Sequence, residues 1–409
     1  MGVSTPLSTL NYQGLFAMYA HTTTIFNQLL DFVPKDKFNR FVGQHTADRY
    51  VKSLTTWNQF VALLYAQATG KDSLREIETG FSAHQNLWYH LGVQSVARST
   101  LSDANGRRDW RIFRDLFGEI LGRCRDVTPQ RNKFAFDNPL YALDATTISL
   151  CLSVFDWAKY RTTKGALKLH TLLNVRTAIP EIVVVTEGKT ADIAAGKRLD
   201  LSMLEKRSIL VFDRGYIDYG WWHELKKNEL FFVSRAKSNT MITVLGVHAP
   251  ADTTKGILKD QRVFIGEHYG YETYPEAVRM VVYHDTETDE TYTYLTNNFK
   301  LSALDIARIY KQRWQVELFF KWIKQNLKIK TFLGTSKNAV LTQIWVAMIY
   351  YLLLAYIKFQ TKYSQSLLEL TRIVRETLLI RRHLIDVLSL TTRTIARLTM
   401  RDGPQMALF

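Results

Sequence analysis

The chain has 409 residues, 46% of them hydrophobic, and a formal net charge of +15. This length predicts about two or three domains with a substantial core, and the charge favours a polyanion partner, nucleic acid before a membrane surface, over an ordinary basic protein without a special partner. The only two cysteines, Cys124 and Cys151, exclude a disulfide scaffold and a cysteine-based zinc site.

The N-terminal region, residues 1–130, is predicted to be helical, because apolar residues recur there every three or four positions. Its first residues show no basic segment followed by an apolar run, so we expect no signal peptide. After Gly92, a polar helix that carries Arg98, Ser99 and Thr100 gives the outline of a helix-turn-helix. Any small helical hairpin gives the same outline, so DNA reading by this helix and a purely structural role both stay open.

Residues 127–138 have the composition of a linker, and beyond them the hydrophobic period becomes that of strands. Three strand-like runs precede an alternation of helices and strands that extends to residue 237, and shorter strand-like runs fill residues 238–299. This order predicts an α/β fold with a mixed sheet and a β-rich insertion.

Two aspartates of this region occupy positions that do not suit a solvated side chain. Asp144 lies inside the apolar run LYALDATTISL, where an unpaired charge would be costly, and Asp213 directly follows the strand SILVF. Both positions suit metal ligands better. By contrast, Asp156, Asp192 and Asp218 have polar or helical surroundings and are predicted to lie at the surface.

A single helix is predicted over residues 302–328, and it carries one narrow polar stripe. On a helical wheel, Tyr310, Arg313, Glu317 and Lys324 fall within about 60° of one another, while the rest of the helix is mostly apolar. An i,i+4 ion pair contributes only about 0.2–0.5 kcal/mol and would explain Arg313 with Glu317, but not the whole stripe. A carboxylate that binds a metal beside cations that bind phosphate explains all of it.

The next run, residues 340–359, is long and apolar enough to cross a membrane. Because it contains Gln343 and follows a charged helix, we predict a buried core helix, with a membrane span as the alternative. Residues 361–409 are predicted to be a helical tail with basic faces, and His170 is predicted to be a structural histidine. A cytoplasmic protein without membrane contact is therefore expected.

The three acids and the polar stripe resemble the signature of the DDE transposases of bacterial insertion sequences, most closely the insertion sequence 4 family. The glutamate motif of that family is Y-x2-R-x3-E-x6-K, and Tyr310, Arg313, Glu317 and Lys324 match every spacing. The segments FDRGY and LDATTISL resemble those around its other two acids. The resemblance covers about residues 140–335.

This resemblance implies a ribonuclease-H-like core in two parts, residues 138–237 and 300–360, on either side of the insertion. It further implies a DNA transposase that binds terminal inverted repeats and moves an insertion sequence by cut-and-paste, through metal-dependent cleavage and strand transfer. The implied partners are double-stranded DNA, both transposon ends and target, and a second copy of the chain in a homodimer on DNA. The implied location is the bacterial cytoplasm, at the nucleoid.

The resemblance also assigns roles to residues. Asp144, Asp213 and Glu317 would be the catalytic residues and would hold two Mg²⁺ or Mn²⁺ ions. The remaining stripe residues would contact DNA, as would Arg98, Ser99 and Thr100 in the N-terminal region.

One feature departs from the family pattern. Relatives can stack a flipped base on a tryptophan of the insertion, and no tryptophan lies between Trp222 and Trp314. Either an aromatic residue such as Tyr292 or Phe299 replaces it, or the base is stacked elsewhere on the protein, so the residue stays unassigned. Two other functions stay open: a ribonuclease-H-like nuclease specific for branched DNA, and a non-catalytic repressor derived from a transposase.

Overall fold

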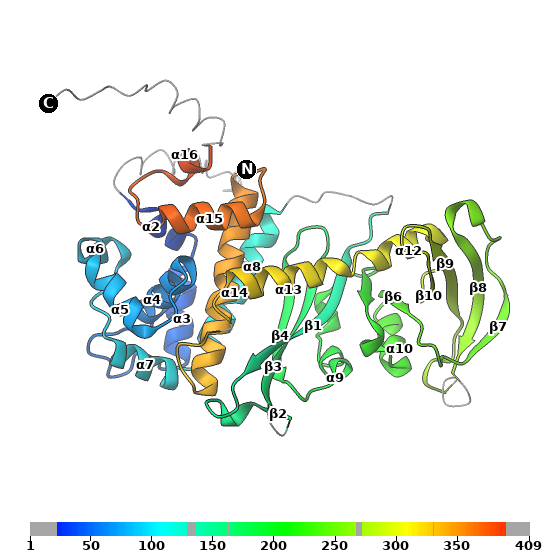
Figure 1. The fold of residues 1–409 in the computed structure, drawn as a ribbon, viewed down its shortest axis with the longest axis horizontal. Helices are drawn as coiled ribbons and strands as arrows, with labels where there is room; N and C mark the ends of the chain where they lie inside the picture. The colour runs from blue at the N-terminus through cyan, green and yellow to red at the C-terminus, as the bar shows by residue number, and fades with distance from the viewer. Residues whose placement is uncertain (1–22, 129–135, 162–163, 267–271, 330, 390–409) are drawn as a thin grey trace, which may run out of the picture. The chain divides into compact units, whose positions relative to one another are not determined.

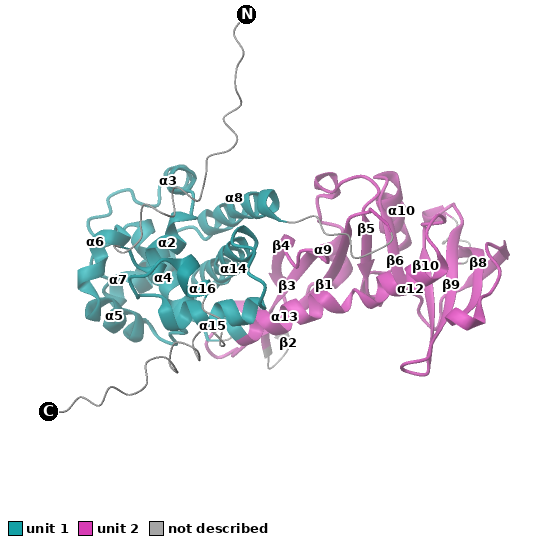
Figure 2. Cartoon of the chain, turned by 90° about the horizontal axis from the view of Figure 1, so that it is seen from above, with its two compact units in different colours: residues 1–128, 326–409 teal, residues 129–325 magenta. Residues whose placement is uncertain are grey.

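The computed structural model describes residues 23–128, 136–161, 164–266, 272–329 and 331–389. The chain divides into two compact units, coloured separately in Figure 2. The helical unit comprises Met1–Thr128 and Asn326–Phe409, and the sheet unit comprises Pro129–Gln325. The predicted basic segment RTIARL and the first 22 residues lie outside the described part of the chain.

The helical unit is built around one apolar helix, α14, which packs against α8 and α4. Capping side chains fix where several of these helices begin: Thr55 accepts the N–H of Asn58 before α4, and Ser336 accepts that of Ala339 before α14. The described helices of this unit are α2 (Ile25–Asp31), α3 (Lys35–Gln44), α4 (Thr56–Thr69), α5 (Leu74–Ala83), α6 (Trp88–Leu91), α7 (Arg98–Arg107), α8 (Arg111–Val127), α14 (Lys337–Gln360), α15 (Leu367–Thr377) and α16 (Leu384–Ser389).

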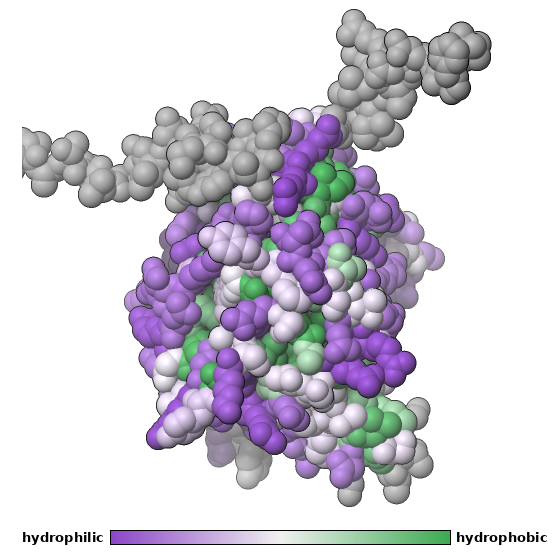
Figure 3. Space-filling view, turned by 90° about the vertical axis from the view of Figure 1, so that its left-hand side faces the viewer, coloured by the Kyte–Doolittle hydropathy of each residue, from purple (hydrophilic) through white to green (hydrophobic). Residues whose placement is uncertain are grey.

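Helix α14 corresponds to the apolar run that could have been a membrane span. Among the described helices it alone has the length and composition of a span, but 94% of its most apolar window is buried inside the protein. The ring of Trp345 stacks on that of Trp110, with centroids 6.3 Å apart. Hydrophilic side chains cover much of the face of this unit that is seen in Figure 3. The prediction of a buried core helix is therefore confirmed.

The sheet unit contains one mixed sheet, with strand order β4-β3-β1-β5-β6-β10-β9-β8-β7 and the short β2 beside β3. Strand β1 pairs antiparallel with β3 and parallel with β5, and β5 pairs parallel with β6. Three antiparallel strands followed by two parallel ones is the ribonuclease-H-like arrangement, so the predicted fold class is confirmed. The strands are β1 (Leu140–Leu150), β2 (Lys159–Arg161), β3 (Lys164–Asn174), β4 (Pro180–Glu187), β5 (Ile209–Phe212), β6 (Phe231–Arg235), β7 (Ile242–Val247), β8 (Ile257–Ile265), β9 (Val278–Asp285) and β10 (Glu290–Thr296).

The predicted insertion extends this sheet. Strand β10 pairs antiparallel with β6, and β9, β8 and β7 follow outward from it. Strand β7 has no counterpart in the sequence prediction, because most of its side chains are exposed and it lacks an alternation of buried and polar residues.

Helices cover both faces of the core sheet. Figure 2 shows α9 (Asp192–Gly196) and α10 (Tyr219–Lys227) on one side and α12 (Ala303–Lys311) and α13 (Trp314–Asn326) on the other. The first side holds a large apolar cluster that includes Leu143, Phe212, Trp221 and Trp222. Since side chains alternate along a strand, the neighbours of Leu143 and Phe212 in sequence point to the face of α12 and α13.

Two predicted helices differ from the structure. Within the predicted alternation of helices and strands, the run ADIAAGKRLDLSML, residues 191–204, has the pattern of one helix. The structure has only α9 and a 3₁₀ turn there, because Asp200 caps that turn by accepting the N–H of Ser202. The helix expected over residues 302–328 is interrupted at Gln312 and Arg313, where N–H groups bond to carbonyls three residues back. The polar stripe therefore spans two helices and the turn between them.

Candidate functional site

The two predicted aspartates lie on neighbouring parallel strands. Leu143 of β1 is opposite Phe212 of β5, which brings the next residues, Asp144 and Asp213, to adjacent strands. The Asp144 Oδ1 atom accepts the N–H of Ala145 at 2.7 Å. Asp213 follows the end of β5, and its Oδ1 accepts the N–H of Gly215 at 2.9 Å. Both carboxylates are thus held by the backbone and stand at one edge of the sheet.

Arg313, in the turn between α12 and α13, connects the helices to this edge. Its Nη1 atom lies 3.2 Å from Oδ2 of Asp144 and 2.6 Å from Oε1 of Glu317. Just before the turn, Lys311 Nζ lies 2.9 Å from Oδ2 of Asp285, at the end of β9. Ion pairs therefore anchor the chain on both sides of the break, which gives a physical reason why the helix does not continue through it.

Burial and nearby charges shift the pKa values of Asp144 and Arg313. Burial raises the pKa of Asp144 to about 6; the Ala145 N–H and Arg313 oppose this, while Asp213 and Glu317 add to it. Burial lowers the pKa of Arg313, but Tyr310, Glu317 and Asp144 outweigh it and raise the pKa overall. A carboxylate with a raised pKa among other acids and one shared cation is the kind of group found at functional sites.

A row of aromatic rings continues from Tyr310 into the insertion. The ring of Tyr310 lies 4.9 Å from that of Tyr294, which stacks on Tyr292 at 6.0 Å, and the guanidinium of Arg235 lies 4.6 Å from the Tyr292 ring. Burial raises the pKa of Tyr310. The sequence reading missed Arg235, although it ends β6 just as Asp213 follows β5. Phe299 lies instead beside Arg262, at 5.5 Å.

The remaining predicted DNA-binding residues lie on two helices, α13 of the sheet unit and α7 of the helical unit. Lys324 lies on α13, two turns after Glu317, and is partly buried. Arg98, Ser99 and Thr100 are exposed at the start of α7, where the N–H of Arg98 donates to a carboxylate oxygen of Glu78 at 3.0 Å. The helix-turn-helix outline is present as α6, Gly92 and α7, and its reading of DNA stays a prediction.

The donor set of the site fits a hard divalent cation by its chemistry, because Asp144, Asp213 and Glu317 offer carboxylate oxygens. Two of these side chains already converge on one cationic atom, Nη1 of Arg313. Within the described ranges, no three His, Cys, Asp or Glu side chains form a metal-binding group as they stand. A bound ion would therefore share this space with the Arg313 guanidinium.

Asp192, predicted to lie at the surface, begins α9 with 33% of its side chain exposed. Its Oδ1 accepts a hydrogen bond from Lys168 Nζ at 2.9 Å, and its Oδ2 lies 3.5 Å from the point where a Cβ on Gly215 would stand. The buried His170 nearby shares a hydrogen bond with Thr186 at 2.9 Å, as a structural histidine would. A sequence pattern could not find Asp192, because an acidic residue at a helix start is common for other reasons.

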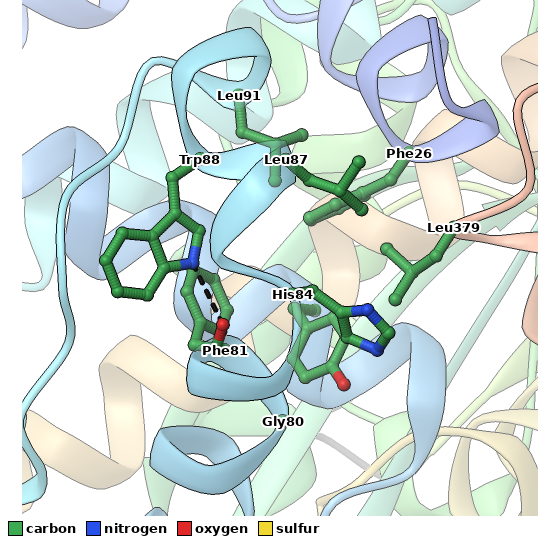
Figure 4. Close-up of a pocket in the computed structure, with 9 residues that line it drawn as sticks. Phe26, Gly80, Phe81, His84, Leu87, Trp88, Leu91 and Leu379 are labelled. Atoms are coloured by element: carbon green, nitrogen blue, oxygen red, sulfur yellow. Dashed lines mark hydrogen bonds between the residues drawn. The ribbon is translucent and has the colours of Figure 1, made fainter.

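The helical unit contains a small hollow, which Figure 4 shows. Apolar side chains such as Phe26, Leu91 and Leu379 line it, and the indole N–H of Trp88 donates to the carbonyl of Phe81 at 2.9 Å. Its lining has no cluster of charged groups, so we interpret it as a packing feature between helices.

Comparisons with known proteins agree with the chemistry of this site. Residues 135–353 match the family described as a transposase DDE domain, and residues 21–94 match a domain of unknown function. A protein of Sinorhizobium fredii named as a transposase is 31% identical over 307 residues, which cover 72% of this chain and 80% of that protein. The transposase named for insertion sequence element IS5377 of Geobacillus stearothermophilus is 30% identical over 272 residues, covering 66% and 70%.

Among solved structures, the piggyBac transposase in a synaptic complex with hairpin DNA aligns with 98% of this chain and 87% of its own. The TM-score is 0.44 and the identity 9%, a level of similarity that carries no inference.

Proposed function

The chain belongs to the DDE transposase family, and on this premise we propose that it binds terminal inverted repeats and moves an insertion sequence by metal-dependent DNA cleavage and strand transfer. The observation that carries the proposal is the convergence of Asp144 and Glu317 on Arg313, beside Asp213. Asp144 and Glu317 are 173 residues apart in sequence, so the fold brings distant acids together. Membership of the insertion sequence 4 group within the family stays a prediction.

Three carboxylates would perform the central task of this site. Asp144, Asp213 and Glu317 would hold divalent ions, Mg²⁺ or Mn²⁺, two in each site. Such ions, when bound, supply an activated water and charge neutralisation at the phosphate. The backbone N–H bonds to Asp144 and Asp213 fix the two strand carboxylates in place before any ion binds.

The neighbouring polar groups would hold the DNA backbone. Arg313 can form two parallel hydrogen bonds to a phosphate, whereas Lys324 acts as a point charge and Tyr310 as a hydroxyl donor. The freed 3′-hydroxyl of the DNA would then be the nucleophile that attacks target DNA, so no covalent bond to the protein is needed. Tyr292, stacked under Arg235, presents an aromatic face next to this site for an unpaired base.

The N-terminal helix α7 would add DNA contacts through its exposed residues Arg98, Ser99 and Thr100. A homodimer on DNA would join the two transposon ends in one complex, in the bacterial cytoplasm at the nucleoid. These parts of the proposal rest on the net charge of +15 and on the family.

The test uses duplexes that carry the inverted repeats found beside the gene. In Mg²⁺, the wild type should nick the ends and join a pre-cut end to target DNA, while Asp144→Asn, Asp213→Asn and Glu317→Gln should cleave only at background and still bind the repeats. Cleavage of branched DNA without joining would favour the nuclease, and binding without nicking by the wild type would favour the repressor. Wild-type cleavage by any one variant would remove that residue from the site.

A further inference from the structure

We propose that Asp192 is a fourth acidic residue of the site, forming with Asp213 and the Tyr216 hydroxyl a subsite for a hydrated divalent cation. This inference rests on the proposed function, and it extends the site beyond the three acids of the family motif. Mg²⁺ keeps several water ligands and binds proteins through one or two carboxylates, so a subsite of this composition suits it.

Asp192 is held in a fixed orientation. Lys168 Nζ donates to Oδ1 of Asp192 at 2.9 Å and to the carbonyl of Thr190 at 2.9 Å. The side chain of Asp192 is only 33% exposed and that of Lys168 only 17%. Within the described chain, no hydrogen bond is made to Oδ2 of Asp192. One carboxylate oxygen is thus anchored, and the other is available to a ligand.

The available oxygen faces the end of β5. A Cβ on Gly215 would stand 3.5 Å from Oδ2 of Asp192, and 3.0 and 3.7 Å from the two carboxylate oxygens of Asp213. The oxygens of two acids therefore converge on a glycine, whose missing side chain leaves the space between them open. Asp192 is the first residue of α9 and Glu317 belongs to α13, and these two helices cover opposite faces of the sheet.

Tyr216 supplies the second, independent observation. Its ring is fully buried against Phe212 and Trp221, yet its hydroxyl has no hydrogen-bond partner among the described residues. A Cβ on Gly196 would lie 3.2 Å from Cδ1 of this ring, so the ring packs against α9, the helix that begins with Asp192. Burial raises the pKa of the Tyr216 hydroxyl, and the negative charges of Asp144, Asp192 and Asp213 raise it further. An unpaired buried hydroxyl costs about 1–3 kcal/mol, and a bound ion or its water would satisfy it.

The local charge also favours a cation. Asp213 has no ion-pair partner among the described residues, and Lys168 is the cation paired with Asp192. Repulsion between two acids that meet at Gly215 is relieved when a divalent ion lies between them or shares water molecules with both.

The alternative is that Asp192 merely favours the start of α9. Asp218 provides a matched control, because it caps the start of α10 and pairs with Lys197 at 2.6 Å. The atoms nearest a Cβ on Gly215 belong to Asp213 and Asp192 and not to Asp218, so Asp218 serves the same structural purpose without facing this glycine. Asparagine is also a good helix cap, so Asp218→Asn should fold normally.

The experiment measures Mn²⁺ binding by isothermal titration calorimetry on the full chain without DNA. Asp192→Asn should weaken binding about tenfold to hundredfold and Tyr216→Phe about tenfold, the usual range for residues that support a metal site. Asp218→Asn should stay within about twofold of the wild type. Circular dichroism melts without metal would confirm that each variant is folded, and Tyr216→Phe removes one oxygen while keeping the packing.

Two results would overturn the inference, and they can be told apart. If Glu317→Gln loses Mn²⁺ while Asp192→Asn and Tyr216→Phe bind as the wild type does, the extra subsite is wrong and the proposed function stands. If the wild type binds no Mn²⁺, both fail together.

Discussion

Two arginines of the sheet unit bind carboxylates in different ways. Arg279 of β9 lies in the insertion, where Nε and Nη2 bond to Asp260 at 2.8 and 2.7 Å and Nη1 bonds to the carbonyl of Leu301 at 2.6 Å. Both partners of this ion pair are almost fully buried, at 2% and 1% exposure. Arg313 shares Nη1 between Asp144 and Glu317, is 20% exposed, and leaves its Nε without a partner among the described residues.

The difference separates a structural arginine from one that suits a ligand. Arg279 uses its donors on one acid and on the carbonyls just before α12, so it ties the insertion to the start of the helices that carry Arg313 and Glu317. Arg313 has donors to spare and stands among acids that repel one another. We infer that the first region is optimised for stability, while the second gives up stability for binding.

The largest effect should follow the loss of the structural arginine. Arg279→Met leaves Asp260 buried without its partner, which should lower the free energy of unfolding by about 3–5 kcal/mol. Urea unfolding followed by circular dichroism would measure this. The control, Lys255→Met, breaks an exposed pair with Asp252 in the same insertion and should leave the free energy of unfolding essentially unchanged, because water screens such a pair. If the Arg279 variant were as stable as the wild type, Arg279 would not have the structural role assigned to it.

An intermediate effect of opposite sign should follow the loss of a site acid. Burial raises the native pKa of Asp144 to about 6, above the usual aspartate value of about 3.9. Between these values the native protein binds more protons than the unfolded chain, so stability falls as the pH rises through them. In chelator, Asp144→Asn should therefore be more stable than the wild type by roughly 1–3 kcal/mol near neutral pH. The difference should vanish below about pH 4, and a destabilised variant at neutral pH would contradict the account.

The smallest effect on stability should follow the loss of Arg313. In chelator, Arg313→Gln should lower the free energy of unfolding by less than Arg279→Met does, because Arg313 and Asp144 keep 20% and 19% of their side chains exposed whereas Arg279 and Asp260 are almost fully buried. End cleavage should nonetheless fall roughly tenfold to hundredfold, the value of a hydrogen bond to a charged group. Mn²⁺ binding without DNA should be at least as tight as in the wild type. A variant that unfolds as readily as Arg279→Met would remove the distinction.

The order and type of most core elements could be predicted, because the signals are local. Asp144 lies within an apolar strand and Asp213 directly follows another. A carboxylate at either position is costly unless a ligand or a partner compensates its charge, so both could be recognised from the sequence. The run around Gln343 was long and apolar, and α14 is buried as predicted. The types of these elements could be predicted because buried residues alternate every two positions in strands and every three or four in helices.

The rest depends on contacts between distant residues, which no local pattern contains. The turn at Arg313 exists where ion pairs to Asp144 and Asp285 anchor the chain, so a wheel drawn for one continuous helix could not place Tyr310 relative to Glu317. The position of Asp192 beside Asp213 likewise arises only when α9 packs on the turn that follows β5.

The central claim is that Asp144, Asp213 and Glu317 surround one divalent-cation site. Iron(II) bound there, with ascorbate and peroxide, would generate hydroxyl radicals that cut the nearest backbone. The account predicts cuts close to all three residues in the wild type, displaced by Mg²⁺ and lost in Glu317→Gln. Cuts confined to other segments, or cuts near only one of the three acids, would contradict it.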